Sequence, residues 1–293
     1  MKGPFALDDA LSFKSPLRYP GGKTRVARRL LAYAPDHEHY REVFAGGAAL
    51  FFRKVKSEDS WINDTHPGLY AFYVALRDHF VSFAAMCRKQ KGDLKDIFDY
   101  WAGRRDLMSD ESENNLVERA VQFYFINRTV WGGRVVYDPR RKSRLYFSNP
   151  QGWGNLENKL AQLERVSQKL QGVKLTCLSF EKCLDDLPED AFVYCDPPYM
   201  RDTYCHPGDK LYDKTFNEQH HLLLAKLLDR TPAKVMVSYD DCPQARELYS
   251  ASKWRVVEMQ WKYCGRYAVS KQDKAEGVKE TKVDGRELLI LNF

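Results

Sequence analysis

A strand, a glycine-rich turn, a helix and a second strand follow one another near the N-terminus, and this order constrains the fold most. The run 40–44 predicts a buried strand that enters the small-residue turn 45–49. A helix is expected from Leu50, and a second short strand over 61–64. Units of this kind open a sheet of parallel strands connected by helices. The sequence therefore predicts an α/β fold.

The middle of the chain departs from this alternation. Residues from 69 to about 127 have helical periodicity and few strand signals. An irregular stretch rich in glycine, proline and arginine follows over 128–154. We therefore expect one α/β domain, built from residues 1–69 and 161–293, that is interrupted by a helical and basic insertion of residues 70–160.

Strands and helices alternate again after the insertion. Short apolar runs over 173–178, 191–195 and 234–238 predict buried strands. Two final runs, 255–261 and 287–293, predict a late antiparallel hairpin. The expected sheet is therefore mostly parallel, with an antiparallel pair at its end.

The four residues Asp196-Pro197-Pro198-Tyr199 directly follow the strand predicted over 191–195. Open α/β sheets bind their ligands at this carboxyl end of the strands. Proline has a fixed φ and no N–H to donate, so the pair holds an acid, a carbonyl and an aromatic ring in a rigid arrangement. An exocyclic amine has two N–H groups that need acceptors, and a flat base needs a stacking surface. The segment therefore predicts a binding site for a base with an exocyclic amine.

The turn Phe44-Ala45-Gly46-Gly47-Ala48 predicts a cofactor site. Its small residues let a ligand approach the backbone beside the electropositive start of a helix. Asp64 ends the next strand about 20 residues on, where nucleotide-binding units place an acid for ribose hydroxyls. Neither a phosphate loop nor a full GxGxxG is present, so an adenosyl ligand without phosphates fits best. A plain turn, with Asp64 as a cap for the helix near Pro67, stays open.

Charge points to a polyanionic partner. The chain has 46 basic and 40 acidic residues, a formal net charge of +6. A basic run in the insertion is opposed only by Asp138 and interleaved with Tyr137 and Tyr146. Such a run suits contacts to phosphates. Its members are Arg134, Arg140, Arg141, Lys142 and Arg144.

Cysteine usage argues against a metal or disulfide framework. The seven cysteines are scattered and form no CxxC pair, so no metal site is expected. Reduced thiols are typical of the cytoplasm. We see neither a signal peptide nor an apolar stretch of membrane-spanning length, so a cytoplasmic protein with no membrane contact is expected.

Taken in order, these motifs resemble the Dam-like (D12 class) adenine-N6 DNA methyltransferases, and the likeness covers nearly the whole chain. The matching segments are Tyr-Pro-Gly-Gly-Lys at 19–23, Phe-Ala-Gly-Gly at 44–47, Phe-Tyr-Phe-Ile-Asn-Arg at 123–128, Asp-Pro-Pro-Tyr at 196–199 and Gly-Arg-Glu-Leu-Leu-Ile at 285–290. Asn-Asp at 63–64 also matches. The resemblance implies a Rossmann-like methyltransferase sheet with a helical target-recognition insertion, S-adenosylmethionine as the cofactor and double-stranded DNA as the partner.

Site residues follow from the same resemblance. The residues expected to bind S-adenosylmethionine are Tyr19, Lys23, Phe44, Gly46, Asp64 and Asp196. The catalytic segment is Asp196-Pro197-Pro198-Tyr199, in which Asp196, Pro197 and Tyr199 would hold a flipped-out adenine. The residues expected to contact DNA are Arg128, Arg134, Arg140, Arg141, Lys142 and Arg144. The sequence leaves open whether a restriction enzyme is a partner, and it does not predict the oligomeric state.

Two departures from the family pattern affect what can be carried over. Ala48 stands where the family usually has a second glycine. After Asn127-Arg128, the segment Trp131-Gly132-Gly133-Arg134 and the basic run replace the usual asparagine-glycine and Phe-Asn-Val-Pro elements. The resemblance therefore implies no particular DNA recognition sequence.

The chemistry can be stated from the residues themselves. Adenine N6 is a poor nucleophile because its lone pair delocalises into the ring. If the Asp196 carboxylate and the Pro197 carbonyl accept both N–H bonds, the lone pair localises toward a methyl donor, and developing charge is stabilised. The same acceptors would serve a cytosine-N4 methyltransferase, which stays open as an alternative. A DNA-binding protein without catalytic activity is the other alternative.

Overall fold

The computed structural model describes residues 13–19, 21–104, 106–107, 112–133, 135, 147–148, 154–200, 216–262 and 284–293. These residues form a seven-stranded sheet in the order β3-β2-β1-β4-β5-β7-β6. The strands are β1 (His39–Glu42), β2 (Asp59–Asn63), β3 (Lys174–Thr176), β4 (Phe192–Cys195), β5 (Lys234–Asp240), β6 (Arg255–Lys262) and β7 (Asp284–Leu291). Strands β1 to β5 pair in parallel, and β7 pairs antiparallel with β5 and β6. The predicted mostly parallel sheet with a late antiparallel pair is confirmed.

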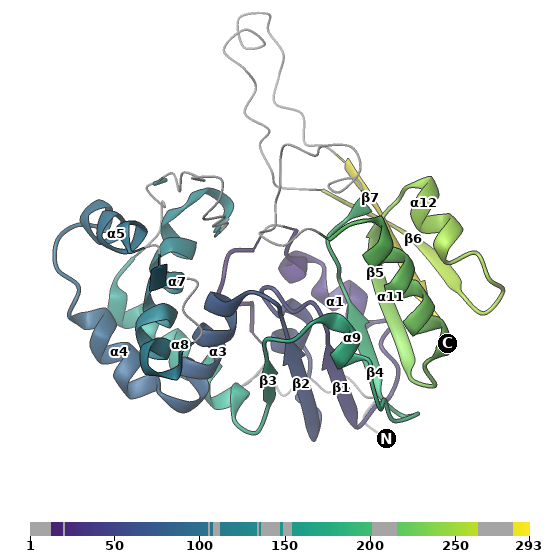
Figure 1. The fold of residues 1–293 in the computed structure, drawn as a ribbon, viewed down its shortest axis with the longest axis horizontal. Helices are drawn as coiled ribbons and strands as arrows, with labels where there is room; N and C mark the ends of the chain where they lie inside the picture. The colour runs from purple at the N-terminus through teal and green to yellow at the C-terminus, as the bar shows by residue number, and fades with distance from the viewer. Residues whose placement is uncertain are drawn as a thin grey trace, which may run out of the picture.

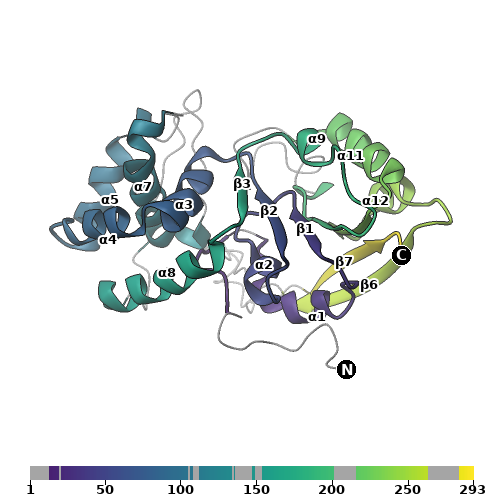
Figure 2. The same cartoon turned by 90° about the horizontal axis from the view of Figure 1, so that it is seen from below.

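Helices cover both faces of this sheet (Figure 2). Helices α1 (Ala27–Leu31) and α2 (Ala49–Arg53) lie on one face, after the 3-10 turn η1 (Lys23–Arg25). Helices α9 (Phe180–Cys183), α11 (Glu218–Arg230) and α12 (Pro243–Leu248) lie on the other. Side chains of β4 alternate between two separate apolar clusters, Phe192 and Tyr194 in one and Val193 and Cys195 in the other. A strand buried on both faces explains why the run 191–195 is continuously apolar.

A second group of helices packs beside the β3 end of the sheet (Figure 1). It consists of α3 (Pro67–Asp78), α4 (Phe80–Arg88), α5 (Leu94–Gly103), η2 (Glu113–Asn115), α7 (Leu116–Thr129), η3 (Trp131–Gly133) and α8 (Leu156–Leu170). Helix α7 is buried around most of its circumference, and its Tyr124 ring stacks on Phe72 of α3 with centroids 5.6 Å apart. A helix buried on all sides belongs to a core. The boundaries of the predicted insertion stay a prediction, and residues 160 and 161 both lie within α8.

Asn127 of α7 ties this helical group to the loop before η1. Its Oδ1 accepts the Arg18 N–H at 3.2 Å, and its Nδ2 donates to the carbonyls of Arg18 at 2.7 Å and Gly133 at 3.0 Å. Gly133 has φ of 72°, and a Cβ there would lie 2.2 Å from the Arg18 carbonyl oxygen. These contacts fix the backbone just before Tyr19 and Lys23, so the helical group positions a loop that belongs to the sheet's carboxyl end.

We expect Gly133→Ala to lower the free energy of unfolding by at least about 2 kcal/mol more than Gly132→Ala. Both glycines have a left-handed backbone, so each alanine carries a backbone strain of about 1 kcal/mol. Only the Cβ at Gly133 would collide with the Arg18 carbonyl; at Gly132 it meets no atom within 4 Å in the described part of the chain. Urea denaturation of both variants measures the difference, and equal losses would contradict the close approach.

Candidate active site

The carboxyl ends of three neighbouring strands meet where the sequence predicted a site. Strand β1 pairs with β2 on one side and with β4 on the other. Just beyond β1, the Val43 N–H donates to the Tyr194 carbonyl at 3.1 Å, and the Ala45 N–H donates to the Asn63 carbonyl at 2.9 Å. The glycine turn, Asp64 and Asp196 therefore leave the sheet at adjacent positions.

Gly46 is held in the glycine turn from three sides. Its N–H donates to Asp64 Oδ2 at 2.8 Å, and its carbonyl accepts the Tyr73 hydroxyl at 2.9 Å. Its φ is 47°, and a Cβ would lie 2.7 Å from Cε1 of the Tyr19 ring. Only glycine fits this combination of backbone and contact. The next left-handed residue, with φ of 46°, is Ala48, which stands where the family usually has glycine.

Asp64 joins the end of β2 to the turn and to α3. Its Oδ1 accepts the His66 N–H at 2.9 Å, while Oδ2 holds Gly46. The N-cap of α3 is His66, whose Nδ1 accepts the N–H groups of Gly68 and Leu69. Asp64 therefore anchors the turn and is not itself the cap of the helix.

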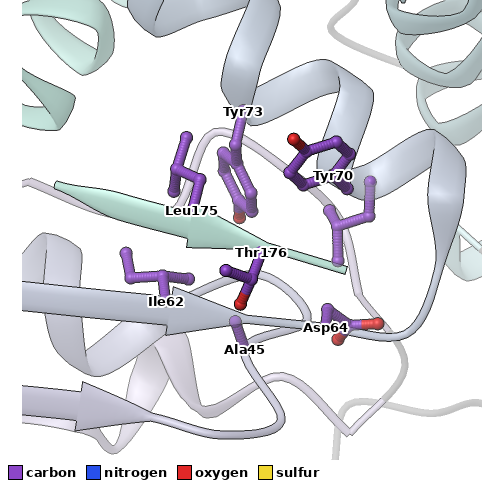
Figure 3. Close-up of a pocket in the computed structure, with 8 residues that line it drawn as sticks. Ala45, Ile62, Asp64, Tyr70, Tyr73, Leu175 and Thr176 are labelled. Carbon is purple, nitrogen blue, oxygen red and sulfur yellow. The ribbon is translucent and has the colours of Figure 1, made fainter. Parts of the chain in front are cut away.

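A small hollow lies beside Asp64 and the turn (Figure 3). Two tyrosines reach down from α3 toward the ends of β2 and β3, and Asp64 lies at one side. The residues that line the hollow are Ala45, Ile62, Asp64, Leu69, Tyr70, Tyr73, Leu175 and Thr176. None of these eight is cationic. The hollow thus combines apolar walls with one carboxylate and several hydroxyls.

Asp196 forms an ion pair with Lys23. The Lys23 Nζ lies 2.8 Å from both carboxylate oxygens and also donates to the Gly21 carbonyl at 3.0 Å. The Asp196 side chain is only 19 % exposed and the Lys23 side chain 5 %. Burial raises the pKa of Asp196 to about 6, the Lys23 ammonium opposes this rise, and Glu287 adds to it. The carboxylate is therefore ionised at neutral pH, although it is largely shielded from water.

Tyr199 and Glu287 complete this group. The Tyr199 hydroxyl donates to Glu287 Oε2 at 2.6 Å, and the Lys23 Nζ lies 3.9 Å from the same oxygen. The Lys23 ammonium also lies 4.8 Å from the centroid of the Tyr199 ring. The sequence analysis gave Glu287 no role. A glutamate within the apolar run of the last strand was the available signal, since a buried carboxylate needs a partner.

The chain after β4 is fixed on both sides of the aromatic ring. Pro197 is buried and Pro198 is half-buried. Beyond Tyr199, the Met200 N–H donates to Oδ1 of Asp240, the last residue of β5, at 3.1 Å. The predicted rigid segment therefore begins at the end of one strand and is held by the end of the next.

The predicted site residues form two neighbouring groups, one at the glycine turn and one at Asp196, and a single N-terminal loop reaches both. Tyr19 lies against the glycine turn, whereas Lys23 reaches Asp196. The Phe44 ring packs at 5.8 Å from that of Phe180 and at 5.7 Å from that of Phe216. Phe180 and Phe216 carried no prediction, because their contact with Phe44 depends on the packing of α9 and α11 against the turn.

Of the residues predicted to contact DNA, the structure describes Arg128 alone. It is half-buried near the end of α7; burial lowers its pKa, and the nearby Arg18 adds to this effect. The pKa of Lys159 on α8 is also lowered by burial and by Arg128 and Arg18. Three cations thus gather where α7, α8 and the Arg18 loop meet. The rest of the basic run, Arg134, Arg140, Arg141, Lys142 and Arg144, lies outside the described residues.

The described residues hold neither a cluster of metal ligands nor a membrane-spanning helix. No three histidine, cysteine, aspartate or glutamate side chains gather there as ligands for a metal ion. No helix there is long and apolar enough to cross a membrane.

Comparison with known proteins identifies the family. The sequence model of the D12 class N6 adenine-specific DNA methyltransferases matches residues 19–263. The chain is 28 % identical to the type II methyltransferase M.MjaIII of Methanocaldococcus jannaschii, over 78 % of this chain and 84 % of that protein. It is 27 % identical to the type II methyltransferase M1.LlaDCHI of Lactococcus lactis, over 79 % and 83 % respectively. A DNA adenine methylase of Haemophilus influenzae is 23 % identical, over 87 % and 89 %.

These matches decide between the alternatives that the residues alone left open. They favour adenine N6 over cytosine N4, and an enzyme over a DNA-binding protein without catalytic activity. The chain belongs to the D12 class N6 adenine-specific DNA methyltransferases.

Proposed function

We propose that this enzyme transfers the methyl group of S-adenosylmethionine to the N6 of an adenine flipped out of double-stranded DNA, with Asp196 and the Pro197 carbonyl as the acceptors of the amine. One observation carries the proposal. An ionised, largely buried carboxylate is held by Lys23 beside a glycine turn at the carboxyl end of the sheet. That is where open α/β sheets bind ligands.

The residues at the turn fit the chemistry of S-adenosylmethionine. The Asp64 carboxylate suits the ribose hydroxyls, and the apolar walls of the hollow suit an adenosyl group that carries no phosphate. The cofactor supplies an activated methyl group on a positively charged sulfur. Asp196 and Glu287 place negative charge near this edge, which favours a cationic ligand. Tyr19 and Lys23 would close the site, because their loop lies against both the turn and Asp196.

Asp196 retains the capacity to bind the target amine while paired with Lys23. A carboxylate offers about four lone-pair positions; the Lys23 ammonium takes two of them, the Tyr199 hydroxyl also acts on the carboxylate, and one position is enough for the amine. The amine would donate one N–H to Asp196 and the other to the Pro197 carbonyl. Withdrawing both protons toward acceptors localises the nitrogen lone pair. Charge develops on N6 during transfer, so a preorganised carboxylate stabilises the transition state more than the ground state.

Tyr199 would stack on the flipped adenine. Enzymes that modify a base take it out of the duplex and commonly hold it against an aromatic ring. The ring is fixed at its hydroxyl end by Glu287, and the chain beyond it by Asp240. Because the ring has few orientations, it would hold the base in one position relative to Asp196. Correct orientation of the reacting groups increases the rate of methyl transfer.

Arg18, Arg128 and Lys159 would bind DNA phosphates together with the basic run. Burial and the nearby Arg18 lower the pKa of both Arg128 and Lys159, and a phosphate would relieve the repulsion among the three cations. Two of the relatives are named type II methyltransferases, which favours a restriction-modification system with a restriction enzyme as partner. Action on cellular DNA also favours the cytoplasm as the location.

We expect Asp196→Ala to lower the rate of methyl transfer by about 10³-fold or more, because the developing charge on N6 loses its acceptor. Labelled methyl transfer to DNA from a host without adenine methylation measures this rate. The matched control is Asp190→Ala, which removes an exposed carboxylate before β4 and should keep the parental rate. Near-normal methylation by a folded Asp196→Ala variant, with an unchanged circular dichroism spectrum, would refute the proposal.

The acid limb of the rate should lie near pH 6. Asp196 must be ionised to accept an N–H, and the pKa of its carboxyl in the folded protein is raised to about 6. Above this pH the group is charged, so kcat/KM is expected to be constant there and to fall about tenfold per unit below it. Asp196→Asn should have a low rate without this limb. A parental rate that stays constant to pH 5 in folded protein would contradict the assignment.

Lys159→Ala should weaken DNA binding in a salt-dependent way. Loss of one phosphate contact reduces the slope of log K against log salt concentration by about 1, for any DNA sequence. Fluorescence anisotropy with a labelled duplex at several salt concentrations measures the slope. Lys226→Ala on α11, an exposed lysine across the sheet, is the matched control and should leave the slope unchanged. Identical slopes for both variants would exclude Lys159 from the interface.

A further inference from the structure

We propose that Glu287 is a positioning residue of this active site. It holds the Tyr199 ring through the phenol hydroxyl and lies beside the Lys23 ammonium that binds Asp196, so that the acceptor and the stacking surface are aligned before the base enters. The inference rests on the proposed function, because it concerns how that site is held in place. Glu287 is not assigned to contact the adenine or the methyl donor.

Glu287 lies at a place where a charged residue needs a specific reason. It is on β7, between β5 and β6, opposite Asp240 on one side and Met259 on the other. Its side chain is 1 % exposed, and its neighbours Leu288, Leu289, Ile290 and Leu291 belong to the apolar clusters. Burying a carboxylate is unfavourable unless it is hydrogen-bonded and paired. The partners of the Glu287 side chain therefore indicate its role.

Two of these partners, Tyr199 and Lys23, are predicted site residues. The Tyr199 hydroxyl donates to Oε2 at 2.6 Å, which is short for an O–H···O bond and typical of an ionised acceptor. The Lys23 Nζ lies 3.9 Å from the same oxygen and 2.8 Å from both oxygens of Asp196. One glutamate thus fixes the ring that would stack and also adjoins the cation that fixes the acceptor.

The arrangement has an electrostatic consequence. Two carboxylates share one ammonium, and the negative charge of Glu287 disfavours ionisation of Asp196, so it raises the pKa of the Asp196 carboxyl. Lys23 from η1 acts in the opposite direction, as does the Tyr199 hydroxyl. On the neighbouring strands, Glu42 of β1, Tyr194 and Cys195 of β4 and Asp240 of β5 are further titratable groups near this end of the sheet. A variant that keeps the shape but removes the Glu287 charge therefore has a predictable effect on pH dependence.

The first experiment compares Glu287→Gln with Glu258→Gln. The glutamine keeps an oxygen that can accept from Tyr199 but has no charge, so the acid limb of kcat/KM should move to lower pH than in the parent. Glu258 is a 70 % exposed glutamate on the adjacent strand β6 and pairs with Arg246. Its glutamine variant should keep the parental limb. An unchanged acid limb in Glu287→Gln would overturn the proposal, because replacing a glutamate with a merely structural role would not change the pH at which kcat/KM falls.

The second experiment removes the hydrogen bond. Glu287→Ala removes the acceptor at 2.6 Å from the ring hydroxyl, and Tyr199→Phe removes that hydroxyl but keeps the ring. Each should lower kcat by about 10- to 100-fold with little change in KM, because misplacement of the base affects the transition state. If both act through one bond, the double variant should be no slower than the slower single variant. Additive losses would show that the two residues act separately.

Failure of this inference can be distinguished from failure of the proposed function. If the parent protein does not methylate DNA with S-adenosylmethionine, the proposed function itself fails. If the parent methylates DNA and Glu287→Gln, folded by circular dichroism, has the parental rate and acid limb, then only the role of Glu287 fails. If Glu287→Ala does not fold, Glu287→Gln still tests the proposal.

Discussion

The ion pair between Lys23 and Asp196 is the interaction on which the site depends. A carboxylate at the buried end of β4 would be unfavourable alone, and burial already raises its pKa to about 6. The ammonium at 2.8 Å keeps it ionised and aimed. Because the pKa of the Asp196 carboxyl is raised in the folded protein, this group contributes stability below the ordinary pKa of aspartate. That contribution is lost as the pH rises through about 6. A reactive group held in this way is typical of an active site.

Three distant parts of the chain hold this pair in place. Lys23 comes from the loop near the N-terminus, which Asn127 of the helical group fixes by two hydrogen bonds to Arg18. Asp196 comes from β4, and Glu287 comes from the last strand. The candidate site of this chain thus depends on packing between the sheet, the helical group and the chain's final hairpin. A change in any of these can disturb the acceptor without touching it.

Most of the fold could be predicted from local pattern. Apolar runs with one or two buried faces located the strands. Strand β5 continues to Asp240, two residues beyond the prediction, because pairing with β7 extends it. The short helices α9 and α12 were not predicted, since four and six residues carry too little periodicity.

The site was predictable where one segment carries the chemistry and not where partners come from far away. Asp196-Pro197-Pro198-Tyr199 and the glycine turn signal themselves by residue type. Asn127 and Glu287 do not, because their partners are 109 and 88 positions away in sequence. No local pattern encodes such a contact; only the topology of the sheet brings β7 next to β5, one strand away from β4.

The most direct test of the account is a structure of the enzyme with duplex DNA and a non-reactive analogue of the methyl donor. The account predicts the N6 of a flipped adenine within about 2.6–3.2 Å of an Asp196 carboxylate oxygen, with Lys23 still on the same carboxylate. An adenine whose amino group is held by other residues, with Asp196 engaged by Lys23 alone, would contradict it.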